Sequence, residues 1–153
     1  MDKGQTFLYK KCSYTFINRS SLSADICKQG WSYFDGFCYF TSSACAAWLT
    51  AASNCSAMGS SLVTVHNHEE NVYIQHRHHG ERSWIGLNDR SVEGSFVWIN
   101  TELSGFRVWA PKQPNNFKNE DCVHTLGAKH DYEWNDVPCD SCFNYTCFKG
   151  TPK

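Results

Sequence analysis

The spacing of apolar residues predicts two amphipathic helices in the first half of the chain. After Ser42 and Ser43, apolar side chains recur at i, i+3 and i+4 spacing as far as Gly59, which predicts a first helix with one of the two serines as its N-cap. Asn67 is followed three residues later by Glu70, a pair that resembles a capping box and predicts the start of a second helix. The remainder lacks helical spacing.

Short apolar and aromatic runs predict strands and loops in that remainder. Two aromatic runs flank Asp35-Gly36, a dipeptide that favours a tight hairpin turn. Further strands are predicted at residues 83–87, 96–98, 121–126, 133–137 and 145–148. Residues 88–94 and 103–119 are predicted loops. The second loop is long for a compact domain, and loops of this length are usually functional.

The length of the chain, 153 residues, is sufficient for one domain. We expect an N-terminal arm at residues 1–26, a domain at 27–149 and a tail at 150–153. The 14 basic and 15 acidic residues form no run of like charge, so the sequence predicts no binding surface for nucleic acid or anionic membranes. No stretch approaches the roughly 20 apolar residues of a membrane span. Recognition of a partner is therefore expected at a local site.

The nine cysteines lack paired zinc-binding spacing and predict disulfides formed in an oxidising compartment, hence a secreted, extracellular protein. Met1 to Lys11 has no apolar core of a signal peptide, so we expect a mature form behind an added methionine. Glycosylation sequons at Asn18 and Asn144, and a poorer one at Asn54, agree with secretion and a glycoprotein.

Oxygen-bearing side chains concentrate in the predicted loop at 103–119 and in the two strands after it, and calcium takes such oxygens as ligands. A cis bond before Pro114 would turn the side chains on either side of it in the same direction. A disulfide between Cys122 and Cys139 would hold the two strands together. The alternative is a set of ordinary solvated loop residues, against which the surrounding cysteines and tryptophans argue. The candidate calcium ligands are Gln113, Asn115, Glu120, Asn135 and Asp136.

These residues belong to a series of landmarks whose order resembles the C-type lectin-like domain family. The match runs from about Cys27 to Lys149, and its landmarks are Cys27, Trp31, Cys38-Tyr39, Cys55, Trp84-Ile85-Gly86-Leu87, Gln113-Pro114-Asn115, Glu120-Asp121-Cys122, Trp134-Asn135-Asp136, Cys139 and Cys147. Residues 84–98, together with WNDVPC, also resemble the lectin domains of large extracellular-matrix proteoglycans. The resemblance implies an α+β fold without catalytic activity, with two helices, small antiparallel sheets, three or four disulfides and a long loop that binds calcium and sugar. The disulfides that it implies are Cys27–Cys38, Cys55–Cys147 and Cys122–Cys139.

The resemblance further implies two calcium sites. The ion whose open coordination positions take two neighbouring sugar hydroxyls would be held by Gln113, Asn115, Glu120, Asn135 and Asp136. The auxiliary ion would be held by Asp89, Glu93, Asn116, Glu120 and Asp121.

The sugar itself is less sharply indicated. In the family, Glu-Pro-Asn tends to mark mannose-type sugars and Gln-Pro-Asp galactose-type sugars, so Gln113-Pro114-Asn115 is a hybrid. Phe117 lies where a ring would stack on a galactose-type sugar, and its alternative role is a buried loop anchor. The sequence therefore favours galactose or N-acetylgalactosamine.

Three cysteines remain after the disulfides that the resemblance implies. Cys45 precedes Cys55 in the predicted first helix by about 15 Å, and Cys142 precedes Cys147 by about 16 Å at strand rise. If the helix and the strand run parallel, Cys45 and Cys142 form a fourth disulfide. Cys12 is left on the arm, and an odd cysteine in a secreted chain commonly pairs between molecules. A disulfide-linked homodimer is expected, which would raise avidity for glycans.

Other patterns have weaker functional interpretations. Several histidines could bind zinc or copper, but the favoured interpretation is that they are solvated at a helix end and interact with its C-terminal dipole; they are His66, His68, His76, His78 and His79. Glu120 and Asp136 could serve a hydrolase as paired acids, but their neighbours suit calcium better. The main alternative to a calcium-dependent lectin with an immune or agglutinating role is a protein- or surface-binding module of the same fold. The presence of Glu120, Asn135 and Asp136 favours sugar binding.

Overall fold

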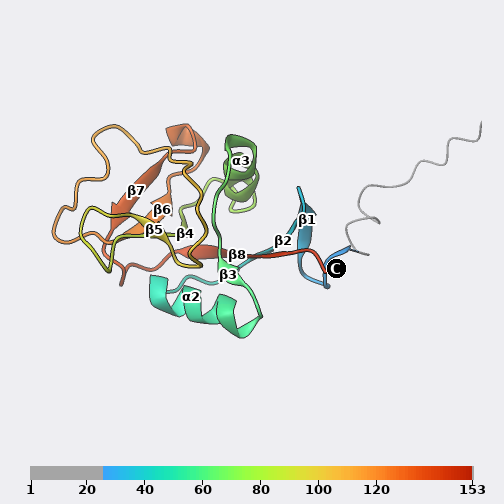
Figure 1. Ribbon diagram of the computed structural model, residues 1–153. Helices are drawn as coiled ribbons and strands as arrows, with labels where there is room; N and C mark the ends of the chain where they lie inside the picture. The colour runs from blue at the N-terminus through green and yellow to red at the C-terminus, as the bar shows by residue number, and fades with distance from the viewer. Residues whose placement is uncertain (1–25, 153) are drawn as a thin grey trace, which may run out of the picture.

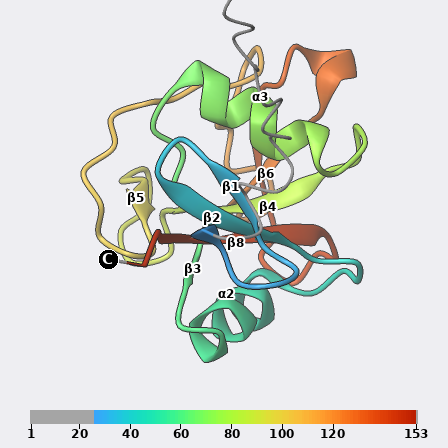
Figure 2. The ribbon, with the colours of Figure 1, turned by 90° about the vertical axis from the view of Figure 1, so that its right-hand side faces the viewer.

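The computed structural model describes residues 26–152 and shows an α+β fold (Figure 1). Helices α2 (Trp48–Ala57) and α3 (His68–His76) lie on opposite sides of the central strands in both ribbon views (Figures 1 and 2). The strands are β1 (Ser32–Phe34), β2 (Phe37–Thr41), β3 (Ser61–Leu62), β4 (Ser83–Asn88), β5 (Val97–Trp98), β6 (Cys122–Thr125), β7 (Trp134–Val137) and β8 (Asn144–Gly150). A short 3₁₀ helix, η1 (Ala128–His130), connects β6 to β7. Within residues 26–152, no helix has the length and apolar character needed to cross a membrane.

The strands form one sheet in the order β1-β2-β8-β4-β6-β7, with β3 added on β8 and β5 on β4. All pairings are antiparallel except that of β4 with β8, which runs parallel. Strand β8 therefore joins the β1–β2 hairpin to the strands that carry the long loop. At its end, the backbone N–H of Thr151 donates to the carbonyl of Gly36 at 3.2 Å.

The predicted hairpin is confirmed: β1 and β2 pair around Asp35 and Gly36, whose φ angles are 42° and 88°. Positive φ at both central residues is the geometry in which Asp-Gly pairs are favoured. The predicted cap of the second helix is also confirmed, because the Asn67 side chain accepts the backbone N–H of Glu70 at 2.8 Å. The Glu70 carboxylate does not return to Asn67 and instead accepts the backbone N–H of His66.

The predicted start of the first helix is wrong. Helix α2 begins at Trp48, and its N-cap Ala47 makes no side-chain cap hydrogen bond. Ser42 instead pairs with Tyr145 in β8, since its N–H donates to the Tyr145 carbonyl at 3.0 Å and its Oγ accepts the Tyr145 N–H at 2.8 Å. Pairing with a distant strand thus replaces the helical turn that the local sequence favours.

The core is rich in tryptophan. Trp48, Trp84 and Trp134 are fully buried and Trp98 nearly so. The indole N–H of Trp48 donates to the Ile85 carbonyl, and that of Trp84 to the Ala46 carbonyl. Buried indoles usually require such a partner. These contacts fasten α2 and its approach to the sheet.

Four disulfides join the described cysteines, in the pairs that the sequence analysis expects: Cys27–Cys38, Cys45–Cys142, Cys55–Cys147 and Cys122–Cys139. The geometric premise for one pair is wrong, because Cys45 precedes α2 and Cys142 precedes β8. An antiparallel bridge between Ala46 and Phe143 brings these two cysteines together. Cys12 lies outside the described residues, as does the sequon at Asn18.

Candidate functional site

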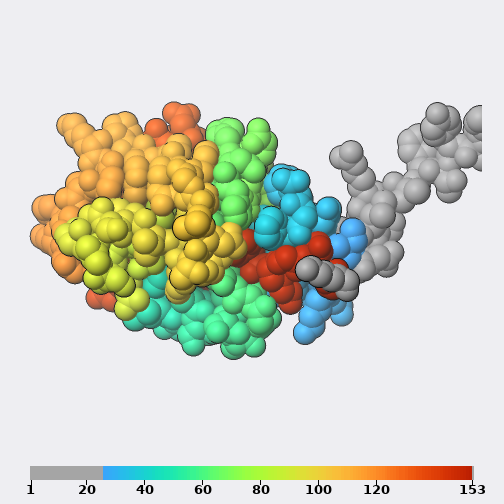
Figure 3. All heavy atoms as spheres, viewed as in Figure 1, coloured from blue at the N-terminus to red at the C-terminus, as the bar shows by residue number. Residues whose placement is uncertain are grey.

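The long loop connects β5 to β6 and contains no helix or paired strand beyond one bridge between Trp109 and Trp134. Its backbone is tied to β7 by hydrogen bonds from Trp134 N–H to the Val108 carbonyl and from Ala110 N–H to the Trp134 carbonyl. In the space-filling view (Figure 3), this loop and the segment between β4 and β5 form the end of the molecule remote from the β1–β2 hairpin. The loop therefore starts from a rigid base on the core.

Asp136 on β7 holds the middle of this loop. Its side chain is fully buried, and both of its carboxylate oxygens accept the backbone N–H of Asn115 at 3.1 Å. The N–H of Asn116 donates to one of the same oxygens at 2.8 Å. The peptide between Gln113 and Pro114 is cis. The structure thus brings Asn115 and Asp136 into contact.

Glu120 closes the loop on its other side. Its carboxylate accepts the Phe117 N–H at 3.1 Å, while its own N–H donates to Asn116 Oδ1 at 2.7 Å. Asn115 Oδ1 also accepts the Phe117 N–H, at 2.9 Å. Partial burial and the nearby Asp136 raise the pKa of Glu120, against a smaller opposing effect of the Phe117 N–H. A cation at this site would relieve the repulsion between the two carboxylates.

Two further predicted ligands present oxygens that lack a hydrogen-bond partner. Gln113 Oε1 and Asn135 Oδ1 are buried and have no partner among the described residues. Buried polar oxygens are almost always satisfied, so each such exception requires an explanation. Amide oxygens of this kind are ligands that calcium accepts.

His124 orients Asn135, a role that the sequence analysis missed. Burial lowers the pKa of His124 to about 4, so the ring is neutral at physiological pH. Its Nδ1–H donates to the Thr125 carbonyl at 2.9 Å, which leaves Nε2 as the acceptor for Asn135 Nδ2 at 3.4 Å. The amide nitrogen of Asn135 is thereby used, and its oxygen remains available. No local pattern in the sequence marks this contact between β6 and β7.

The predicted auxiliary ligands lie beside this region. Asp89 is buried; its Oδ2 accepts the Gly94 N–H at 2.8 Å, and its Oδ1 has no partner among the described residues. The pKa of Asp89 is raised mainly by burial, and the negative charge of Asp121 adds to this effect. Asp121 itself accepts the side-chain amide of Asn119 at 3.3 Å.

A hollow of about 200 Å³ contains members of both predicted ligand sets. Its lining residues are Asp89, Glu93, Gly94, Phe96, Pro114, Asn115, Asn116 and Asp136. Gln113, Glu120, Asp121 and Asn135 are not among them. Over residues 26–152, no three or more His, Cys, Asp or Glu side chains are grouped so as to hold a metal ion. This finding covers the predicted auxiliary acids and the histidines that zinc or copper would suit.

Phe117 projects from the loop. Its side chain is 61% exposed, so the alternative role as a buried loop anchor is wrong. The ammonium nitrogen of Lys118 lies 5.2 Å from the centroid of its ring. An exposed ring next to the predicted ligands offers an apolar face to a bound molecule.

Comparison with known proteins agrees with this fold. The family model "Lectin C-type domain" matches residues 45–149. The versican core protein of Rattus norvegicus is 36% identical over 124 residues, which is 80% of this chain but only 4% of versican; that of Mus musculus matches equally. The chain thus spans a small part of these relatives.

Solved structures of C-type lectin-like domains have the same fold. The cow C-type carbohydrate-recognition domain of CD23, determined in the presence of a GlcNAc2Man3 oligosaccharide, is 31% identical, with a TM-score of 0.77 over 83% of this chain and 98% of that one. A calcium-independent type II antifreeze protein is 26% identical, with a TM-score of 0.76 over 83% and 96% of the two chains. C-type lectin-like domains are binding modules rather than enzymes, and some work without calcium. The expected resemblance is confirmed, and the chain belongs to the C-type lectin domain family.

Proposed function

We propose that this domain binds glycans through a calcium ion held by Gln113, Asn115, Glu120, Asn135 and Asp136. The observation that supports it most directly is the pair of buried, unpartnered oxygens on Gln113 and Asn135. Both residues belong to the predicted ligand set, and a cation would satisfy the two oxygens at once. The unpartnered oxygen of Asp89 supports in the same way an auxiliary ion held by Asp89, Glu93, Asn116, Glu120 and Asp121.

The residues of the chain would recognise the sugar by hydrogen bonding. Bound calcium supplies open coordination positions for two neighbouring hydroxyls. Glu120 and Asp136 accept hydrogen bonds from the sugar hydroxyls, whereas the amide nitrogens of Gln113 and Asn115 donate hydrogen bonds to them. The exposed ring of Phe117 stacks on the apolar face of the sugar, which favours galactose or N-acetylgalactosamine.

The four disulfides support a secreted, extracellular location, because such bonds persist in oxidising compartments. Cys12 would link two chains in a homodimer, with glycans on glycoproteins, glycolipids or microbial surfaces as partners. The second candidate function is a protein- or surface-binding module that does not use sugar. The likeness to a calcium-independent antifreeze protein favours it, as does the absence of a group of three acids over residues 26–152.

A glycan array probed with calcium, and again with chelator, tests the proposal. We expect galactose-type glycans to retain the protein with calcium and to release it with chelator. Retention that survives chelator would exclude the calcium mechanism. A protein that binds calcium but no glycan would support the second candidate function.

Replacing Gln113 with glutamate is expected to raise calcium affinity about tenfold, because affinity follows the number of charged ligands. Without calcium, the new carboxylate is buried where Gln113 Oε1 has no partner, so the melting temperature should fall. Calcium titration by calorimetry measures the first effect and thermal unfolding in chelator the second. Thr50→Glu adds the same charge at an exposed position on α2 and should change neither the calcium affinity nor the melting temperature. Equal calcium affinities for Q113E and the parent would refute the ligand role of residue 113.

A further inference from the structure

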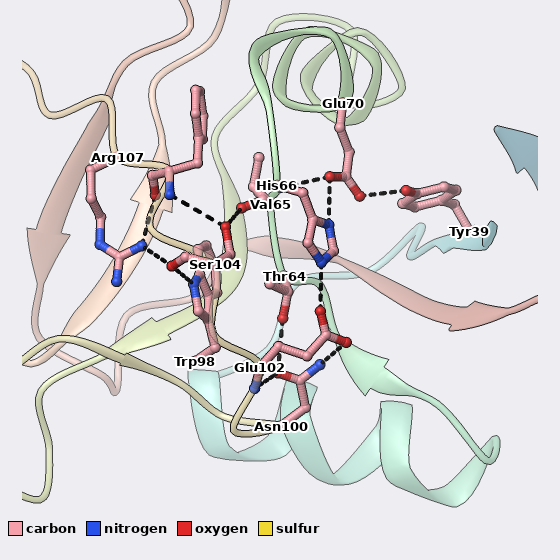
Figure 4. A network of polar contacts seen from close by, with 11 residues as sticks. Tyr39, Thr64, Val65, His66, Glu70, Trp98, Asn100, Glu102, Ser104 and Arg107 are labelled. Atoms are coloured by element: carbon pink, nitrogen blue, oxygen red, sulfur yellow. Dashed lines mark hydrogen bonds and ion pairs between the residues drawn. The ribbon is translucent and has the colours of Figure 1, made fainter. Parts of the chain in front are cut away.

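The first part of the long loop is fastened to the segment between β3 and α3 by side-chain hydrogen bonds (Figure 4). We call residues 99–107 the loop base, since the predicted calcium ligands of the loop follow it in the chain. Thr64 Oγ1 donates to Asn100 Oδ1 at 2.9 Å, and Ser104 Oγ donates to the Val65 carbonyl at 2.7 Å. Figure 4 shows His66 in the same row of contacts, directed at Glu102 of the loop base.

His66 lies between two carboxylates. Its Nδ1 is 2.8 Å from Glu70 Oε2, and its Nε2 is 2.5 Å from Glu102 Oε2. An ionised carboxylate only accepts hydrogen bonds, and a neutral imidazole has a single N–H. Both contacts are therefore satisfied together only by a doubly protonated ring. Partial burial lowers the pKa of His66, but the hydrogen bonds to Glu102 and Glu70 outweigh burial and raise it from the usual 6.5.

Glu70 determines which contact persists when the ring loses a proton. Its side chain is 4% exposed, compared with 38% for Glu102. It also accepts the backbone N–H of His66 and the hydroxyl of Tyr39, whose pKa is raised by burial and by Glu70 so that the hydroxyl remains a donor. Because a buried carboxylate loses more when a donor is withdrawn, the last ring proton stays on Nδ1. The lone pair of Nε2 then faces Glu102.

One other cation lines a hollow with Glu102, Lys149 on β8, but its ammonium nitrogen lies 4.3 Å from the centroid of the Trp31 ring. The rings of Phe37 and Phe148 pack against the imidazole at 5.5 Å and 6.1 Å between centroids. Within the described part of the chain, His66 is the only basic residue that forms an ion pair with Glu70 or Glu102. The proton on His66 therefore controls the direct contact of Glu102 with the core, while Asn100 Nδ2 donates to the other carboxylate oxygen of Glu102 at 2.8 Å within the loop base.

We propose that His66 is a positioning residue: its protonated ring holds the loop base against the core and so keeps the predicted calcium ligands in place, and loss of the proton releases Glu102. A group whose pKa is raised on folding stabilises the folded contact fully below its unfolded pKa and loses this effect as the pH rises through the folded pKa. The loop base is therefore held below the unfolded pKa of about 6.5 and loosens as the pH rises through the raised pKa of His66 in the folded protein. The link to calcium rests on the proposed function, whereas the link to the loop base does not.

Amide hydrogen exchange of the calcium-free protein, from about pH 6 to about pH 9, tests the loop base directly. The N–H groups of Glu102 and Phe106 report on it, because they donate to Asn100 Oδ1 and Ser104 Oγ. After correction for intrinsic exchange, their protection should fall about tenfold as His66 loses its proton, since one charge-assisted hydrogen bond is lost. An NMR titration of the imidazole measures the pKa of His66 separately.

Matched variants separate this effect from general destabilisation. Glu102→Gln offers Nε2 either a donor or an acceptor, so its exchange profile should not vary with pH. Glu69→Gln removes the same charge from an exposed position on α3 and should retain the parental profile. Calcium titrations on the same samples should show weaker affinity at high pH in the parent and not in E102Q.

Each outcome discriminates between the two proposals. Identical pH profiles for the parent and E102Q, or a pKa of His66 at or below its usual value, would overturn the role of His66. A protein that binds no calcium at any pH would refute the proposed function, and the exchange profiles would still decide the role of His66.

Discussion

Replacing Asp136 with asparagine is expected to abolish calcium-dependent sugar binding and leave the domain folded. The buried carboxylate accepts backbone N–H groups from Asn115 and Asn116 at 2.8–3.1 Å. Asparagine keeps the size but turns one acceptor into an NH₂ donor, which would face a backbone N–H. The change also removes one of the two carboxylates in the proposed ligand set. We expect calcium affinity to fall at least about 100-fold, measured by calorimetry, because both ligand charge and loop position are lost.

The control for this variant is Asp140→Asn, which removes a carboxylate from an exposed position outside both proposed ligand sets. Its calcium affinity and glycan binding should equal those of the parent. Circular dichroism should show that both variants keep the fold. If D136N is folded and binds calcium as tightly as D140N does, Asp136 is not a ligand and the proposed site is wrong.

Replacing Trp134 with alanine is expected to lower the free energy of unfolding by about 3–5 kcal/mol. The side chain is fully buried and packs edge-to-face on Trp98 and Phe106, at 6.0 Å and 5.6 Å between ring centroids. Its indole N–H donates to Asn71 Oδ1 on α3 at 2.8 Å. Truncation leaves a cavity and removes a donor from a buried acceptor. Because Trp134 precedes Asn135 on β7, the loss of stability should extend to the proposed calcium site.

Urea unfolding measures this loss, and two other variants calibrate it. Trp134→Phe keeps most of the ring volume but loses the hydrogen bond to Asn71. Its free energy of unfolding should therefore lie between those of the parent and W134A. Trp31→Ala removes a half-buried indole that contacts Phe40 and Lys149 near the surface, and its cost should be smaller. Equal losses for W134A and W31A would contradict the central position of Trp134.

Features that depend on neighbours in the chain could be predicted from the sequence. The Asp35-Gly36 turn and the Asn67 cap each act over a few residues, and both form as predicted. Ser42 shows the limit of such signals: it can cap a helix locally, but in the fold it pairs with Tyr145 in β8. Hydrogen bonding across 103 positions, through the backbone and the hydroxyl of Ser42, outweighs a local preference for a cap.

For the site, the sequence supplied the types of residue but not their orientation. The sequence identifies Gln113 and Asn135 as possible oxygen ligands of a metal ion. No neighbouring residue in the sequence indicates that their oxygens are buried without partners. Asn135 depends on His124, whose tautomer is set in turn by the Thr125 carbonyl. Glu93 and Asp121 could also be named, but they do not form part of a group of three acids over residues 26–152.

The sequence by itself determined the family, the hairpin, the cap of α3 and three of the cysteine pairs, because these follow from short-range patterns and from the order of landmarks along the chain. The pair Cys45–Cys142 depends on the bridge between Ala46 and Phe143, which only the fold provides. Only the tertiary structure decided where α2 begins, which way the amide of Asn135 is turned, and that His66 lies between Glu70 and Glu102. The contact of His66 with Glu102 spans 36 positions, and that of Ser42 with Tyr145 spans 103. Hydrophobic periodicity encodes which face of an element is buried, but not which distant polar group will meet it there.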